Sequence, residues 1–147
     1  MTRKLLLLLV ALTTLLQAAE KEPEIQDLYT YRAVVTRVID GDTIKLSISL
    51  GFNVWVHDQS IRLSGVFAPE TRSGSVEERA SGAKVRDFVS SLLKMDKAVI
   101  VKTEKDSTDK YGRYLGTIWI DGESLNEKIL KFMTDNGISK GGKGVKP

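Results

Sequence analysis

The chain has no cysteine and only one histidine among its 147 residues. The absence of cysteine excludes disulfide bonds, thiolate zinc sites and lipid attachment through a cysteine. A serine–histidine catalytic triad would have to be built on His57 alone, and no nucleophile motif accompanies it. His57 precedes Asp58 in a predicted polar loop, where we expect it to be solvated rather than to bind a metal.

The composition is otherwise that of an ordinary globular protein. Apolar residues make up 41% of the chain and charged residues 28%, and the length suits one domain but not two of typical size. The formal net charge of +3 is a poor guide to the binding partner, because two of the basic residues lie in the N-terminal segment described next. The sequence shows no internal repeat, and we expect a monomer.

The first nineteen residues differ from the rest of the chain. Arg3 and Lys4 precede an apolar run over residues 5–12, and the small residues Ala18 and Ala19 end the segment. A basic head, a short apolar middle and a small-residue end are typical of a secretory signal peptide. The run is too short to span a bilayer comfortably, which takes about 20 residues. We expect a secreted or periplasmic protein with no stable membrane span after cleavage. An uncleaved N-terminal membrane anchor or a buried helix is the alternative.

The rest of the chain divides into three parts by composition. Residues 20–30 are acidic, contain Pro23 and are predicted to form a solvated linker. Residues 31–137 carry the hydrophobic periodicity of a folded domain. Residues 138–147 are rich in glycine and lysine and are predicted to form a flexible basic tail.

Hydrophobic periodicity predicts five strands and two helices within the folded domain. Ser124 with Glu127 matches a capping box at the start of the second helix, and Gly137 is a plausible stop. Trp55 and Trp119 lie on predicted strands, where we expect them in the core rather than as stacking platforms. The expected strands cover residues 31–39, 43–50, 51–66 with a break, 97–103 and 114–120, and the expected helices cover residues 77–94 and 124–137. The order of strands and helices favours an OB-type five-stranded β-barrel with helices, of the α+β class.

Several polar residues each allow an ordinary structural explanation. Asp40-Gly41-Asp42 joins two predicted strands, and aspartate and glycine are common turn formers, although two aspartates at a turn are also typical of a divalent-metal corner. Arg62 lies in the middle of a predicted strand, where an arginine is usually solvated. Glu70 follows a proline, and Arg113 follows a hairpin-like polar loop.

Together, four motifs resemble the staphylococcal nuclease (thermonuclease-like) family. "VIDGDTIKL", "IRLSGVFAPE", "TDKYGRYLGTIWIDG" and "SLNEKIL" occur in the order and approximate spacing of that family, and the resemblance covers roughly residues 31–137. Several separated motifs in order are far more specific than any one alone. The resemblance implies an OB-type five-stranded barrel and a hydrolase that cleaves phosphodiester bonds of DNA and RNA with calcium.

The resemblance also implies roles for individual residues. Arg62 and Arg113 match the two arginines that would grip the non-bridging oxygens of a phosphate with paired N–H donors. Glu70 matches the general base that would activate water. Lys110 and Tyr111 match positions beside the bound nucleotide, where they could contact a phosphate or a base.

The implied Ca²⁺ site is incomplete. Asp42 matches a direct ligand and Asp40 lies just before it, but Phe67 stands where the family keeps a second aspartate ligand. The backbone carbonyl of Ala68 remains as a possible ligand, and loss of one carboxylate is expected to weaken the site. Two functions stay open: a metal-dependent nuclease acting on DNA, RNA or both, and a degenerate OB module that binds nucleic acid or protein without cleaving it.

Overall fold

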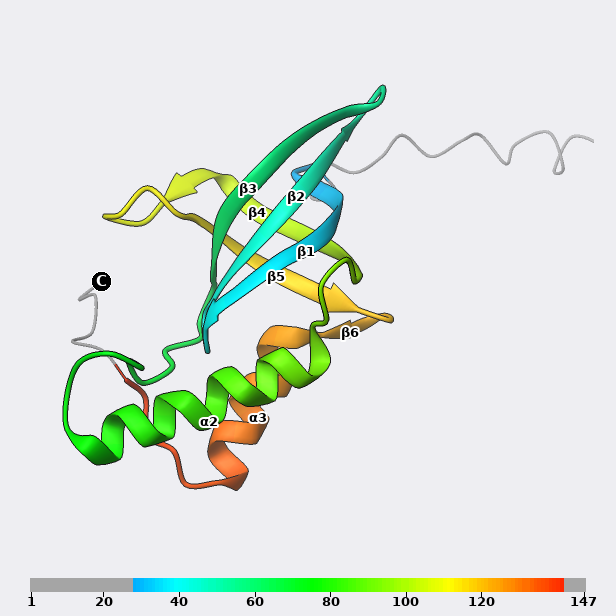
Figure 1. Cartoon of the computed structure of the whole chain (residues 1–147). Helices are drawn as coiled ribbons and strands as arrows, with labels where there is room; N and C mark the ends of the chain where they lie inside the picture. The colour runs from blue at the N-terminus through cyan, green and yellow to red at the C-terminus, as the bar shows by residue number, and fades with distance from the viewer. Residues whose placement is uncertain (1–27, 142–147) are drawn as a thin grey trace, which may run out of the picture.

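The computed structural model describes residues 28–141, which form six strands and two helices (Figure 1). In chain order they are β1 (Thr30–Asp40), β2 (Thr43–Gly51), β3 (Val54–Leu63), α2 (Val76–Leu92), β4 (Ala98–Thr108), β5 (Tyr114–Ile120), β6 (Glu123–Ser124) and α3 (Leu125–Asp135). The predicted signal peptide over residues 1–19 and most of the linker lie outside the described residues. Within residues 28–141, no helix is long and apolar enough to cross a membrane.

The strands close into a barrel. Their order is β3-β2-β1-β4-β5-β6, and a further parallel pairing of β3 with β5 joins the two sides of the sheet. The short β6 pairs only with β5 and leads directly into α3. This five-stranded barrel with two helices confirms the predicted fold class. The parallel β3–β5 pairing matters for the site, because it places the end of β3 beside the start of β5.

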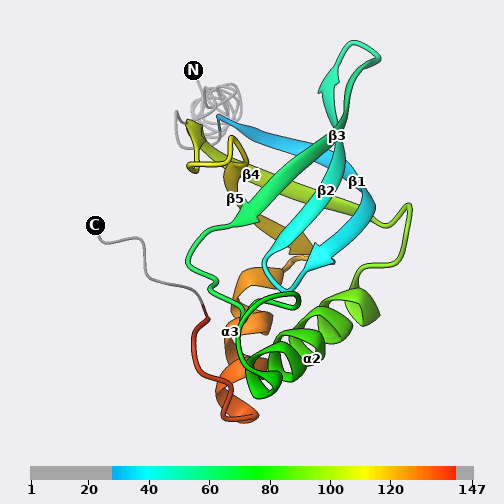
Figure 2. The same ribbon diagram turned by 60° about the vertical axis from the view of Figure 1, so that its left-hand side comes forward.

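Strand alternation fills the barrel interior. Ile44, Leu46 and Ile48 on β2 point inward and are buried, as period-two patterning requires. The two helices lie together at one end of the barrel (Figures 1 and 2) and bury apolar residues against it. The rings of Phe88 and Phe132 stack between α2 and α3, with centroids 4.1 Å apart. The buried apolar residues of the strands and of both helices therefore form one continuous core.

Helix ends follow capping rules, one of which the sequence analysis missed. Ser75 forms a complete capping box with Glu78, and α2 starts at Val76, one residue before the predicted start of the helix. At α3, the Ser124 side chain accepts a hydrogen bond from the Glu127 amide as predicted. Gly137 adopts a φ of +62°, which suits glycine just beyond a helix end and confirms the predicted stop.

Three local predictions were wrong. Strand β4 runs on to Thr108, into the segment expected to be a polar loop. His57 lies on β3 rather than in a loop, and its Nδ1 lies 3.1 Å from the Ser47 hydroxyl. The tryptophans are outside the core: Trp55 is 40% exposed, and Trp119 faces outward between two buried isoleucines of β5. Alternation along a strand explains Trp119, since neighbours of inward residues must point outward.

The buried Asn126 side chain ties α3 to the barrel. Its Oδ1 accepts a hydrogen bond from the Ile118 amide at 3.1 Å, and its Nδ2 donates to the Ser64 carbonyl at 2.9 Å. We expect Asn126→Ala to lower the free energy of unfolding by about 2–4 kcal/mol, because buried backbone groups then lose their partners. Urea denaturation measures this, and the exposed Lys131→Ala on the same helix is expected to change it by about 0.5 kcal/mol or less. Equal effects of the two substitutions would contradict the role of Asn126.

Candidate functional site

The turn between β1 and β2 is pressed against the segment that follows β3. A Cβ atom added to Gly41 would lie only 2.7 Å from the Ala68 Cβ and from a Val85 methyl group. Glycine is therefore required for this close approach. The contact holds Asp40 and Asp42 beside residues 67–70, and Asp42 is only 7% exposed.

The Asp42 carboxylate is fully engaged by protein groups. Its Oδ2 accepts a hydrogen bond from the Ala68 amide at 3.0 Å and forms an ion pair with Arg62. Its Oδ1 accepts a hydrogen bond from the Thr43 hydroxyl at 3.1 Å. Asp40 supports the turn, because its Oδ1 accepts a hydrogen bond from the Asp42 amide at 3.2 Å. Arg62 reaches this position because it pairs directly with Thr43 in the β2–β3 ladder.

The second arginine is held by the loop before β5. Arg113 donates from Nε at 2.8 Å and from Nη2 at 2.5 Å to Oδ2 of Asp109. Asp109 also organises its own loop, since its Oδ1 accepts hydrogen bonds from the backbone amides of Tyr111 and Arg113. The Nη1 of Arg113 donates to the Thr43 hydroxyl at 2.9 Å. Thr43 therefore bridges the two arginine–aspartate pairs.

Electrostatic effects confirm that the charged groups are neighbours. Burial of the Arg62 guanidinium and then repulsion by Arg113 lower the pKa of Arg62, while Asp40, Asp109 and Glu70 act in the opposite direction. Two cations held close enough to repel one another make a site that an anion would stabilise. The arrangement is suited chemically to binding a phosphate group, whose oxygens match the N–H geometry of guanidinium.

The remaining predicted residues lie at the rim of this site. Glu70 is exposed and lines a hollow of about 390 Å³ together with Lys140. Tyr111 is 70% exposed, and its ring centroid lies 5.3 Å from Cζ of Arg113 and 4.9 Å from Nζ of Lys110. The contacts thus join Asp40, Asp42, Arg62 and Arg113 in one hydrogen-bonded centre. Lys110 and Tyr111 lie next to Arg113, and Glu70 is linked to the centre through the effect of its charge on Arg62.

Two residues of the centre were missed from the sequence. No role was predicted for Asp109 or Thr43, yet both accept hydrogen bonds that fix the orientation of Arg113. A signal for Asp109 was available, because an aspartate four residues before an arginine in a Gly-containing turn can pair with it and cap the turn. No comparable signal identifies Thr43, whose partner lies 70 residues away.

The segment around Phe67 differs from a metal-binding loop. The Phe67 ring centroid lies 5.8 Å from Cζ of Arg62, so the ring packs against a cation where a carboxylate could have bound one. Among residues 28–141, no three histidine, cysteine, aspartate or glutamate side chains cluster closely enough to hold a metal ion. Asp40 and Asp42 are the carboxylates of this turn that could be ligands of a cation, and two carboxylates are fewer than the six to eight oxygen ligands that Ca²⁺ usually takes.

The start of the predicted basic tail packs against this same segment. The Gly141 amide donates a hydrogen bond to the Phe67 carbonyl at 2.9 Å. This contact follows the end of α3 and places Lys140 on the hollow that Glu70 lines. Residues 142–147, the rest of the predicted tail, lie outside the described part of the chain.

Known proteins match the region that carries this site. The family model described as staphylococcal nuclease homologue matches residues 60–137. A thermonuclease from Staphylococcus hyicus is 34% identical over 102 residues, which are 69% of this chain and 55% of the relative. A thermonuclease from Staphylococcus intermedius is 33% identical over 98 residues, which are 67% of this chain and 54% of the relative.

A further match is a much larger protein. The endonuclease YhcR of Bacillus subtilis (strain 168) is 30% identical over 107 residues, which are 69% of this chain and 8% of the relative. The chain spans about half the length of the two thermonucleases.

The Asp109–Arg113 pair predicts a pH-dependent contribution to stability. Burial raises the pKa of Asp109, but hydrogen bonds from Arg113 and Tyr111 and the Arg113 charge lower it below its ordinary value. The contribution is therefore fully present above the unfolded-state pKa of about 3.9 and is lost as pH falls through the lower folded-state pKa. Urea unfolding between pH 6 and pH 2 is expected to show wild type losing its advantage over Asp109→Asn.

The matched control is Asp135→Asn, which removes an exposed ion pair with Lys131. This control is expected to differ from wild type by about 0.5 kcal/mol or less across the range. A constant difference between wild type and Asp109→Asn from pH 6 to pH 2 would contradict the assignment of the lowered pKa to this pair.

Proposed function

Because the chain belongs to the staphylococcal nuclease homologues, we propose that it is a nuclease that hydrolyses phosphodiester bonds of DNA, RNA or both. The observation that carries the proposal is the network in which Thr43 joins the Arg62–Asp42 and Arg113–Asp109 pairs. A module that only bound nucleic acid could spread its cations along a groove. Two partly buried guanidinium groups held close to the Thr43 hydroxyl suit the charge that develops on a single phosphate.

The arginines would act on the transition state. Attack on a phosphodiester is opposed by its negative charge, and charge increases on the non-bridging oxygens as the reaction proceeds. The acidic partners hold Arg62 and Arg113 in place before substrate arrives, so little reorganisation is needed during the reaction. The Arg62 side chain donates a hydrogen bond from Nη1 to the Asp42 carbonyl at 3.3 Å, and its ion pair with the Asp42 carboxylate uses the same nitrogen. Its other N–H groups can then face a phosphate.

Glu70 would act as the general base. Its exposure and its electrostatic coupling to Arg62 support a place beside the phosphate where solvent can enter. The oxygen of a water molecule forms the new bond to phosphorus, and its proton passes to the Glu70 carboxylate. The opposite P–O bond breaks, and its electron pair leaves with the ester oxygen, which takes a proton from solvent. Lys110 and Tyr111 are proposed to contact the neighbouring phosphate or base of the substrate.

A divalent cation, proposed to be Ca²⁺, would be held by Asp42 with Asp40 behind it. When bound, the cation would supply Lewis-acid stabilisation of the phosphate oxygens. The sharing of the Asp42 carboxylate with Arg62 and Ala68, and the phenyl ring at Phe67, support weak cation binding in the absence of substrate. We thus propose a nuclease in which the substrate phosphate would add to the few ligands that the protein gives the cation.

The proposed setting is outside the cytoplasm. The basic, apolar and small-residue pattern of residues 1–19 supports secretion or export to a periplasm. The protein is proposed to act as a monomer, since all the groups named above come from one chain. The alternative, a degenerate module that binds without cleaving, draws its support from Phe67 in place of a carboxylate, and the next two experiments separate it from the nuclease.

The first experiment tests the machinery. Glu70→Gln is expected to lower the rate of cleavage of a labelled oligonucleotide by about 10²- to 10⁴-fold, because the base is lost while the shape is kept. Arg62→Ala and Arg113→Ala are each expected to lower it at least as much. Glu77→Gln is the matched control, since Glu77 is an exposed glutamate in the first turn of α2. If wild type cleaves the oligonucleotide no faster than Glu70→Gln, the degenerate module is favoured.

The second experiment tests the incomplete cation site. Phe67→Asp is expected to tighten Ca²⁺ binding about tenfold or more, because a second carboxylate raises the ligand charge. The readout is the rise in melting temperature with added Ca²⁺, which reports binding without requiring cleavage. Phe67→Leu is the control, since it removes the ring without adding charge. Equal Ca²⁺ responses of wild type, Phe67→Asp and Phe67→Leu would contradict a cation site at Asp42.

A further inference from the structure

One row of residues crosses the whole outer face of the barrel. Residues paired directly across neighbouring strands carry their side chains on the same face. The row begins on β5 and passes over β4, β1 and β2 to β3, and its successive members are Trp119, Ile100, Arg32, Ser49 and Trp55. The side chain of Ile100 is 38% exposed and Arg32 is exposed, whereas the next residues along their strands, Val99 and Ala33, are buried. The row therefore faces solvent.

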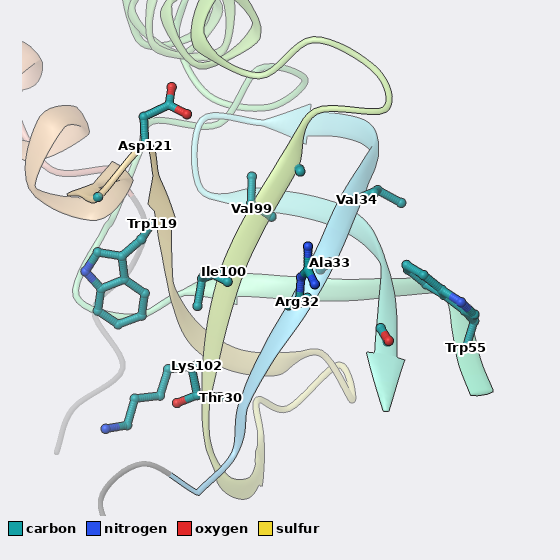
Figure 3. Close-up of a pocket in the computed structure, with 13 residues that line it drawn as sticks. Thr30, Arg32, Ala33, Val34, Trp55, Val99, Ile100, Lys102, Trp119 and Asp121 are labelled. Atoms are coloured by element: carbon teal, nitrogen blue, oxygen red, sulfur yellow. The ribbon is translucent and has the colours of Figure 1, made fainter. Parts of the chain in front are cut away.

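The row forms the floor and walls of a hollow. All five members line a groove of about 860 Å³, and Figure 3 shows Trp119 and Trp55 at its opposite sides with Ile100 and Arg32 between them. Four interstrand spacings of about 4.8 Å give the row a span of roughly 19 Å along the barrel. The groove is therefore long enough for a short extended chain.

The groove carries a positive charge. Arg32 lies at its centre, and Lys102 lies on the same face of β4, two residues beyond Ile100. The acidic side chain at its edge is Asp121, whose carboxylate accepts hydrogen bonds from Lys97 at 2.9 and 3.1 Å. The exposed Arg32 at the centre therefore favours an anion, and the indoles favour flat rings.

The groove is separate from the candidate active site. Arg32 and Asp40 are eight residues apart on β1, which corresponds to roughly 26 Å along an extended strand. The chain contains two tryptophans, and both line this groove. None of the proposed catalytic residues contributes to it.

We propose that this groove binds a single-stranded stretch of nucleic acid, with bases stacked on Trp55 and Trp119 and phosphates contacting Arg32 and Lys102. Aromatic platforms interleaved with cations are how proteins hold unpaired strands, because every base has a π-face and every linkage a charge. A duplex hides its base faces. A flat membrane surface does not fit a concave groove, and an arginine at its centre does not suit an apolar protein partner. The class of ligand rests on the proposed nuclease function, whose substrate is the same polymer.

The two tryptophans supply the test. Intrinsic fluorescence of the full chain is titrated with an oligo(dT) of about twelve nucleotides in EDTA, within the range of OB-fold site sizes. Stacking is expected to quench the emission, and added salt is expected to weaken binding as counterion release requires. Arg113→Ala, altered at the active site, is expected to keep the quenching. Fluorescence quenching therefore tests binding in the groove separately from cleavage at the proposed active site.

Matched variants locate the binding surface. Trp55→Ala is expected to weaken oligo(dT) binding by about 5- to 100-fold, followed by anisotropy of a labelled strand. Arg32→Glu is expected to weaken it at least tenfold and to reduce the salt dependence. The controls keep wild-type affinity: Phe52→Ala removes a fully exposed ring at the β2–β3 tip, and Arg79→Glu reverses an exposed charge on α2.

Three results would overturn the proposal. The first is the absence of quenching by oligo(dT). The second is equal affinity of Trp55→Ala, Arg32→Glu and the two controls. The third is quenching by a duplex of the same length or by phosphatidylglycerol vesicles as strong as that by oligo(dT), which would assign the groove to another ligand.

Discussion

The close approach of two guanidinium groups is the constraint around which the proposed active site of this molecule is arranged. Arg62 lies on β3 and Arg113 directly before β5, and burial together with the charge of Arg113 lowers the pKa of Arg62. Each arginine is anchored by an aspartate, and both networks meet at the Thr43 hydroxyl. Partly buried charges persist only when they are paired and hydrogen-bonded. The four-residue arrangement around Thr43 meets that condition and still leaves a site that an added phosphate would stabilise.

The barrel makes this arrangement possible. The tight Gly41 turn brings Asp42 to the segment after β3, and the parallel pairing of β3 with β5 brings Arg62 on β3 close to Arg113, which directly precedes β5. The helices close that end and bury the core beneath it, while Asn126 ties α3 to the strands. Helices α2 and α3 lie at one end of the barrel (Figures 1 and 2), and the tryptophan-lined groove lies on the outer face of the strands. One closed sheet thus offers two surfaces with separate chemistry.

The sequence predicted what local patterns determine. Alternating apolar residues on β2, the aspartate–glycine turn and the Gly137 stop each act over a few residues, so their structure could be predicted. The resemblance to a nuclease family named the charged residues, but not the contacts that orient them. Thr43 and Asp109 become visible only when strands distant in sequence are paired. The exposure of Trp55 was mispredicted for the same reason, since a strand pattern alone does not tell which half of a long hairpin extends beyond the barrel (Figures 1 and 2).

Arg62 and Arg113 are proposed to form one anion site. The most direct test is NMR of the arginine side-chain N–H groups during titration with a dinucleotide whose phosphorothioate linkage resists cleavage, with signals assigned from Arg62→Lys and Arg113→Lys. Both signals are expected to shift together and to saturate with the same dissociation constant. Movement of only one signal, or two different dissociation constants, would contradict it.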